Sequence, residues 1–404
     1  MPHSLENYAK VSDYYKGENF NPVPIPIEKG LGWHNHIKKR RNLYERHLML
    51  PLRFFKGADV IEFGCNSGEN ALYLASLGAR VTLVEPNEQV LPRLNHLFRA
   101  FALESQVEAL LNTDIEGFSS SKRFDVVIAE GFLSMLDNGE ESFLKICKCL
   151  KEEGTGIISF DDHYGSLLEF MRGLILKLAC QLKGLPFEEW RGKESLNIAS
   201  ELYEEDFRKI NTSRPFESWW QDALVNPFYN SVYSWKLPRV VLLLEKAGCE
   251  FYSSSPKWET IDYYFWYKNA LTSKERHQRL LDSWYENFSF FLLGNNAKKD
   301  ELRPADENIV HAASNLCMQI YQSKMAQDLS KRTIVYPKKL DRYLADSGNK
   351  DLRGINSDLK RLCQVMKNCS FRELVRVYQQ SKYFRNSWGA ACSYLCFKKV
   401  KNEN

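Results

Sequence analysis

The fold of this chain follows from the stretch VIEFGCNSGEN at residues 60–70. It opens with a β-rich run, and Gly64 and Gly68 then place a turn ahead of a helix-like segment. Glycine permits the backbone of a tight turn to approach a ligand closely. The stretch therefore predicts a strand, a ligand-binding turn and a helix, in that order.

Apolar runs and helix-length segments continue to alternate after this stretch. We expect strands at 59–63, 80–85, 124–129 and 156–160, and helices at 68–77, 90–101 and 140–150. Short β-rich runs separated by helices are typical of βαβ units in a parallel sheet. With one further strand ahead of the acidic turn at 112–115, the pattern predicts five strands before residue 162.

The pattern changes after residue 162. Residues 163–236 are helical in character and rich in aromatic residues, which indicates an insertion. A helix at 237–247 ends at Gly248, and runs at 249–256 and 262–267 then suit closing antiparallel strands. Helical periodicity dominates from about residue 270, and a β-rich run at 393–397 is the alternative final strand.

Composition narrows the class of protein. The chain has 55 Lys and Arg against 51 Asp and Glu, so its net charge of +4 gives little attraction for nucleic acid or anionic membranes. Its ten cysteines are irregularly spaced and no signal peptide is apparent, so we expect reduced thiols in the cytoplasm. The most apolar stretch, residues 167–182, is interrupted by charges, and no transmembrane segment is expected.

Acidic residues stand at the ends of successive expected strands, where ligands bind in open α/β sheets: Glu62, Glu85, Asp114 and Glu130. Together with the glycine turn, this order of acidic residues resembles the pattern of the class I S-adenosylmethionine-dependent methyltransferases, a family with a Rossmann-like fold. Within that family, the chain looks like a member of the type 11/12 branch. The resemblance implies S-adenosylmethionine as cofactor and S-adenosylhomocysteine as product.

The resemblance also implies a role for each residue of the motif. The glycine turn and the acid before it would contact the amino-acid half of the cofactor. A carboxylate after the second strand would bind the ribose of the cofactor, and an acidic turn would contact its adenine. The residues that match are Glu62, Gly64, Asn66 and Gly68 for the first, Glu85 and Pro86 for the second, Asp114 and Ile115 for the third, and Glu130 and Gly131 beside the cofactor.

Two features bear on the identity of the cofactor. Asn66 stands where the family usually has a third glycine, and asparagine is the residue that next best tolerates left-handed backbone geometry. A dinucleotide would require G-x-G-x-x-G, but positions 64, 66 and 69 are Gly, Asn and Glu. The pattern therefore favours S-adenosylmethionine over NAD.

The expected fold is a Rossmann-like α/β sheet of seven mostly parallel strands, with a helical lid insertion and a largely helical C-terminal unit. We divide the chain into an N-terminal lid segment at 1–54, a cofactor-binding core at 55–162, an acceptor lid at 163–236, the end of the core at 237–269 and a helical C-terminal unit at 270–404.

Methyl transfer requires the protein to align the acceptor and to remove its proton. We expect Asp162 and His163 to form the catalytic pair, with His163 as the general base because histidine titrates near neutral pH. The alternative is that His163 caps or packs the start of the insertion. A further alternative places Mg²⁺ between Glu130, Asp161 and Asp162, but carboxylates at strand ends also cap helices, and we assign no metal.

The sequence thus predicts methyl transfer to a hydroxyl or amine of a small-molecule, sugar or lipid-linked acceptor, because it has no basic stripe for nucleic acid. Two alternatives stay open, a methyltransferase acting on RNA or protein and a non-catalytic scaffold that binds S-adenosylmethionine and docks a partner. The C-terminal unit is a candidate contact of a homodimer.

Overall fold

The computed structural model describes residues 11–17, 30–210, 214–229, 235–258, 271–294, 297–298, 301–329 and 334–401. The chain forms two compact units. The sheet unit comprises residues 10–160, 235–283 and 392–404, and the helical unit comprises residues 1–9, 161–234 and 284–391. The expected insertion therefore packs in one unit with most of the expected C-terminal helices.

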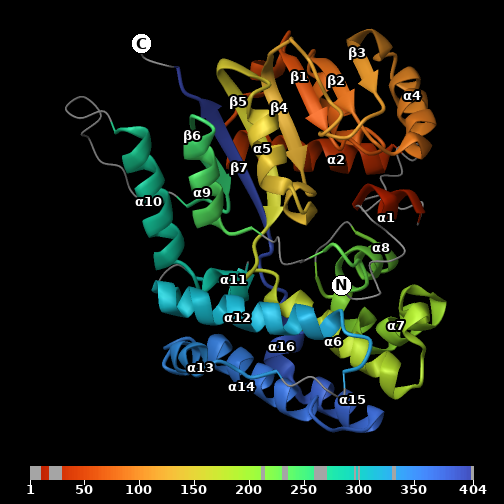
Figure 1. The fold of residues 1–404 in the computed structure, drawn as a ribbon, viewed down its shortest axis with the longest axis vertical. Coiled ribbons are helices and arrows are strands. Elements are labelled where there is room, and N and C mark those ends of the chain that lie inside the picture. The colour runs from red at the N-terminus through yellow and green to blue at the C-terminus, as the bar shows by residue number, and fades with distance from the viewer. Residues whose placement is uncertain are drawn as a thin grey trace. The chain divides into compact units, whose positions relative to one another are not determined.

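A seven-stranded sheet forms the centre of the sheet unit (Figure 1). Its strands are β1 (Asp59–Phe63), β2 (Arg80–Val84), β3 (Val107–Leu111), β4 (Phe124–Glu130), β5 (Leu150–Asp161), β6 (Cys249–Ser255) and β7 (Cys392–Lys399). The order is β3-β2-β1-β4-β5-β7-β6, in which the pairs among the first five strands are parallel and β6 runs antiparallel to β7. This confirms the predicted fold class.

The run at 393–397 is confirmed as a sheet strand, because β7 pairs with β6 from Cys249↔Lys399 to Ser255↔Tyr394. It lies inside the sheet, between β5 and β6. The other expected strand, at 262–267, falls outside the described residues.

Helices cover both faces of this sheet. They are α1 (Val11–Gly17), α2 (Leu31–Arg41), α3 (Glu69–Ser76), α4 (Leu91–Ala100), α5 (Gly139–Cys147) and α9 (Leu237–Lys246), with short turns η3 (Asn42–His47), η4 (Leu52–Phe55), η5 (Glu88–Val90), η6 (Glu104–Gln106) and η7 (Leu133–Met135). Figure 1 shows α5 and α9 in front of the sheet and α2 behind it. Alternate strand residues such as Val60, Leu83 and Ile128 are fully buried in one core with Leu72 and Leu74 of α3, as the two-residue period of a strand requires.

The helix expected at 140–150 ends earlier than its sequence suggests. Helix α5 stops at Cys147, and β5 already begins at Leu150, which pairs with Phe124 of β4. The pairing of Leu150 with β4 overrides the weak helical preference that extended the expected helix to this residue.

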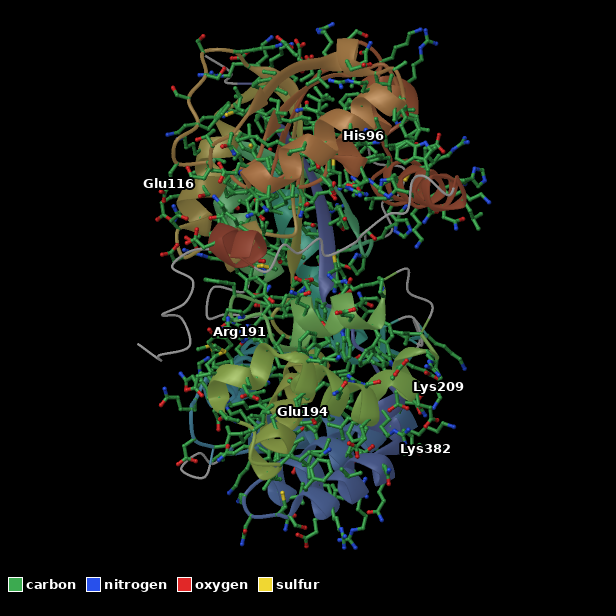
Figure 2. The ribbon with its side chains drawn as sticks, turned by 90° about the vertical axis from the view of Figure 1, so that its right-hand side faces the viewer. His96, Glu116, Arg191, Glu194, Lys209 and Lys382 are labelled. Atoms are coloured by element: carbon green, nitrogen blue, oxygen red, sulfur yellow. The ribbon has the colours of Figure 1, made fainter. Side chains whose placement is uncertain are left out.

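The helical unit is built around one buried helix, α6 (Leu167–Leu182), nearly all of whose residues are buried. Its other elements are η8 (Phe187–Arg191), α7 (Lys193–Phe207), α8 (Phe216–Trp219), η9 (Trp220–Leu224), α11 (Phe290–Leu293), α12 (Glu307–Lys324), α13 (Lys338–Ala345), α14 (Lys350–Val365), α15 (Phe371–Gln380) and α16 (Lys382–Asn386); α10 (Ser273–Glu286) begins in the sheet unit. Charged side chains such as Glu194, Lys209 and Lys382 lie at its surface (Figure 2). Among the described helices, none is long and apolar enough to cross a membrane.

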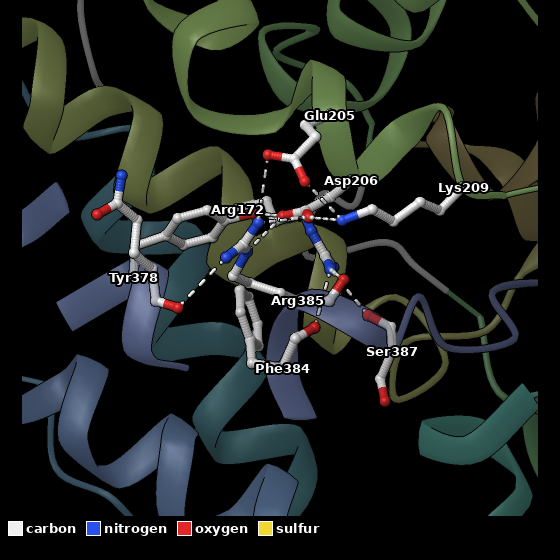
Figure 3. Close-up of polar contacts among 9 residues, drawn as sticks. Arg172, Glu205, Asp206, Lys209, Tyr378, Phe384, Arg385 and Ser387 are labelled. Atoms are coloured by element: carbon white, nitrogen blue, oxygen red, sulfur yellow. Dashed lines mark hydrogen bonds and ion pairs between the residues drawn. The ribbon is translucent and has the colours of Figure 1, made fainter. Parts of the chain in front are cut away.

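A buried arginine ties α6 to the last helix of this unit. Arg172 is fully buried and donates hydrogen bonds to the carbonyl oxygens of Phe384 (3.0 Å) and Ser387 (2.8 Å). Close by, Arg385 pairs with Asp206 of α7 through two contacts of 2.8 Å (Figure 3). Because buried charges are costly unless they are paired and hydrogen-bonded, these contacts fix α16 against α6 and α7.

Candidate cofactor site and the residues around it

The turn after β1 has left-handed geometry at three positions. The φ angles of Gly64, Asn66 and Gly68 are 65°, 46° and 85°. Asn66 therefore adopts the conformation for which the family uses glycine. A Cβ atom at Gly64 would lie only 2.8 Å from the ring of Phe132, so the absence of a side chain lets the turn approach the segment after β4.

The carboxylate of Glu85 joins the turns after β1 and β2. It is buried, and its two oxygens accept hydrogen bonds from the backbone N–H of Asn66 (2.7 Å) and of Asn87 (2.8 Å). Burial raises the pKa of Glu85, and these two bonds oppose that rise. A carboxylate has about four lone-pair sites, so it retains acceptor capacity for a ligand hydroxyl. Pro86 follows with no N–H of its own.

Glu62 at the end of β1 is a buried carboxyl group with a free oxygen. Its side chain is 3% exposed, and its Oε2 atom has no hydrogen-bond partner among the described residues. Burial, followed by the nearby Glu130 carboxylate, raises the pKa of Glu62 to about 8. An unpaired buried carboxyl is costly, which is typical of a group that binds a ligand.

Glu130 at the end of β4 is engaged by an arginine. Arg40 of α2 donates to both oxygens of its carboxylate, at 2.8 and 2.5 Å, and the Tyr394 hydroxyl donates at 3.0 Å. The pairing of Arg40 with Glu130 was not predicted from the sequence, because Arg40 lies in the basic run at 38–41, which resembles a solvated helix face. Arg40 is buried while its three neighbours are exposed. The adjacent Gly131 has a φ of 80°, and a Cβ atom there would meet nothing within 4 Å.

The acidic turn after β3 is partly exposed. Asp114 accepts a hydrogen bond from the backbone N–H of Gly117 at 2.8 Å, and Ile115 is buried. The backbone bond holds the turn in shape.

Helix α1 lies against two of these turns. The Lys16 ammonium contacts Glu88, shortly after β2, at 2.7 Å, and the Tyr15 hydroxyl lies 4.0 Å from the sulfur of Met135, shortly after β4. We expected a lid within residues 1–54 but no helix at 11–17. The sequence signal for this helix is the i,i+3 spacing of Val11 and Tyr14, which are both buried.

The expected catalytic pair belongs to the helical unit. Asp162 Oδ1 accepts hydrogen bonds from the backbone N–H of Tyr164 (2.9 Å) and Gly165 (3.0 Å), which form the turn into α6. The His163 ring is buried, its Nε2 lies 3.4 Å from the carbonyl oxygen of Ser314, and it packs on Phe170. These contacts are those of a turn and a packed core, which favours the alternative interpretation of His163.

The helical unit also holds a buried polar cluster around Glu169. The Trp219 indole donates to Glu169 Oε1 at 2.9 Å, and the Tyr229 hydroxyl donates to Oε2 at 2.7 Å. Burial, with the carboxylates of Glu169 and Asp222 nearby, raises the pKa of Asp161 to about 7. In the described part of the chain, no group of three or more His, Cys, Asp or Glu side chains is arranged to hold a metal ion.

The structure thus brings Glu62, Asn66, Glu85 and Glu130 together in the sheet unit, whereas Asp162 and His163 lie in the helical unit. Arg40, Asn70 and Tyr394 were missed, since each becomes part of the site only through folding; Asn70 donates to Glu130 at 3.4 Å.

Comparison with known proteins identifies a family model, described as a methyltransferase domain, that matches residues 34–226. A curated relative, the ubiquinone biosynthesis O-methyltransferase of Rickettsia akari (strain Hartford), is 28% identical over 124 residues, which cover 30% of this chain and 45% of that protein. The chain therefore matches less than half the length of this relative.

Solved structures with local similarity include the CcbJ methyltransferase from Streptomyces caelestis, with 22% identity and a TM-score of 0.26 over 31% of this chain and 57% of that one. The glycopeptide N-methyltransferase MtfA complexed with sinefungin has 16% identity and a TM-score of 0.27 over 32% and 55%.

Proposed function

We propose that this protein binds S-adenosylmethionine in the sheet unit and transfers its methyl group to an acceptor, since residues 34–226 match the model of a methyltransferase domain. The observation that carries the proposal is an oxygen of Glu62 that has no partner among the described residues and is buried beside the left-handed turn at 64–68. When bound, S-adenosylmethionine supplies an electrophilic methyl group on a sulfonium centre.

The residues present fit the amino-acid half of this cofactor. In the described part of the chain the buried Glu62 Oε2 has no donor, and a cofactor ammonium group would supply one. The positive φ angles of Gly64, Asn66 and Gly68 leave the turn backbone open to close approach. The open space beside Gly131 is consistent with a ligand along the same edge of the sheet.

The residues after β2 and β3 fit the nucleoside half. Glu85 is held in place by two backbone N–H groups and has acceptor capacity left for ribose hydroxyls. We assign Asp114 and Ile115 to the adenine, as a hydrogen-bond acceptor and an apolar contact. Helix α1 would then cover the bound cofactor, since it contacts Glu88 and Met135 on either side.

We assign acceptor recognition to the helical unit, and the acceptor group to a hydroxyl or amine of a small-molecule, sugar or lipid-linked compound. The polar cluster of Asp161, Glu169 and Tyr229 supports this assignment, because it supplies hydrogen-bonding groups among aromatic rings. The roles of Asp162 and His163 as catalytic pair stay a prediction.

Calorimetric titration with S-adenosylmethionine, S-adenosylhomocysteine and NAD tests the cofactor. We expect the first two ligands to bind at micromolar concentration, about −8 kcal/mol, and NAD not to bind. Release of S-adenosylhomocysteine with a pool of hydroxyl and amine acceptors then tests turnover. Binding of NAD, with neither sulfur ligand bound, would contradict the proposal.

A further inference from the structure

The carboxylate of Glu130 is a meeting point for distant parts of the sheet unit. It accepts hydrogen bonds from Arg40 of α2, Asn70 of α3 and Tyr394 of β7. Arg40 also donates to the Tyr44 hydroxyl at 2.5 Å and lies 4.9 Å from the centre of that ring. With so many donors present, Glu130 serves as the counter-ion of Arg40, and its direct contact with the cofactor stays a prediction.

The pair is shielded from solvent. The side chains of Arg40 and Glu130 are 7% and 10% exposed. Charges in such surroundings interact with their neighbours far more strongly than charges at the surface. A change in either partner is therefore felt by any ionisable group beside it.

Glu62 is the ionisable group beside this pair, because β1 and β4 are paired and Glu62 lies opposite Ile128, two residues before Glu130 and on the same face of the sheet. Charged and titratable groups face it from every neighbouring element: Glu130 of β4, Arg40 of α2, Glu69 of α3, Glu85 after β2, Tyr44 of η3 and Cys65 in its own turn. Arg40 is the cation among those that act on Glu62, and it favours the ionised carboxylate, while Glu130 opposes ionisation.

We propose that Arg40 and Glu130 act as a positioning pair, which sets the charge of Glu62 and through it the affinity for the ammonium group of the cofactor. This rests on the proposed function, since it takes Glu62 as the ammonium ligand. An ionised Glu62 forms a charge-assisted hydrogen bond with that group, and a protonated Glu62 does not. Arg40 of helix α2 thereby affects the cofactor site, although the sequence of this helix does not predict a contact with it.

The two partners act on Glu62 with opposite sign, which makes the proposal testable without any ligand. Infrared spectroscopy follows the band of a protonated carboxylic acid, and the band that Glu62→Gln lacks is assigned to Glu62. We expect its titration midpoint to move to higher pH in Arg40→Met and to lower pH in Glu130→Gln. Arg41→Met is the matched control, because Arg41 is 63% exposed and pairs with Glu45, and it leaves the midpoint unchanged.

Calorimetry with S-adenosylmethionine, repeated from pH 6 to 9, gives the second readout. At pH 7, below the titration midpoint of Glu62, we expect S-adenosylmethionine to bind about tenfold more weakly to Arg40→Met than to the wild type. A rise of one pH unit in that midpoint lowers the ionised fraction of Glu62 by this factor. Loss of the ligand's own ammonium proton at high pH is common to all variants. Arg40→Lys retains the charge, so it restores the midpoint although it lacks the two-pronged contact.

Infrared midpoints that are equal in all variants would overturn the inference, whatever their affinities. Affinities that fall equally at every pH in Arg40→Met and Glu130→Gln, with no opposite shifts, would also overturn it, because that is the result of a merely structural role. Opposite infrared shifts in a protein that binds no S-adenosylmethionine would support the control of Glu62 by the pair and contradict the proposed function instead.

Discussion

At the scale of single residues, the site depends on carboxylates that face different partners. Glu85 is held by two backbone N–H groups, Glu130 by Arg40, and Glu62 has a free oxygen among the described residues. The sequence placed all three at strand ends, because period and spacing determine where a strand stops. It could not assign partners, since Arg40 lies 90 residues from Glu130.

Substitution of Glu85 tests the ribose contact. Glu85→Ala removes the hydroxyl acceptor, and we expect S-adenosylmethionine binding to weaken by about 1 to 3 kcal/mol in calorimetry. Glu104→Ala, an exposed glutamate in η6, is the control and leaves affinity unchanged. Equal affinities for the wild type and Glu85→Ala would contradict the assignment of Glu85.

At the scale of elements, the strands were easier to predict than their limits. The expected strand at 59–63 matches β1, all five of whose residues are buried. The expected helix at 140–150 was wrong after Cys147, because pairing of Leu150 with Phe124 is a contact between distant residues that no local pattern reveals. The burial of Arg40 in α2 escapes prediction for the same reason, because its partner Glu130 is 90 residues away.

The contact between α6 and α16 is the element-scale feature most open to test. Arg172→Met removes a buried donor from two carbonyl groups: that of Ser387 loses its guanidinium partner, and that of Phe384 keeps only the backbone N–H of Ser387. We expect the local unfolding free energy of α16 to fall by about 2 to 4 kcal/mol. Hydrogen exchange of the α16 amides measures it, since a chain of two units need not unfold in one step.

Arg208→Met provides the comparison for this experiment. Arg208 is 74% exposed and pairs with Glu204 on the same helix, so its loss is expected to change stability by no more than about 0.5 kcal/mol. Protection of α16 that is the same in Arg172→Met and in the wild type would show that the buried arginine does not hold this helix.

At the scale of the whole molecule, the sheet is completed by a strand from far along the sequence. Strand β7 at residues 392–399 lies between β5 and β6, after the chain has built the helical unit. Local patterns, namely apolar runs and turn residues, predict such a strand but not its neighbours. The grouping of residues 161–234 with 284–391 was likewise beyond local patterns, because it depends on packing between segments distant in sequence.

Truncation tests the role of β7. A chain that ends at residue 390 leaves β5 and β6 without their shared neighbour and removes the Tyr394 hydroxyl from Glu130. We expect it to lose the cooperative thermal transition of the sheet unit in circular dichroism and to lose S-adenosylmethionine binding. A chain that ends at residue 401 is the control, and cooperative unfolding of the shorter chain would contradict the prediction.

The position of β7 also has a consequence for protein synthesis. A ribosome that has translated residues 1–390 has released every strand of the sheet except the one that joins β5 to β6. Non-local pairing of this kind is slow to form and leaves strand edges exposed meanwhile. The nascent chain therefore waits for residues 392–399 before the sheet can close, and chaperones that shield unpaired edges would act during that interval.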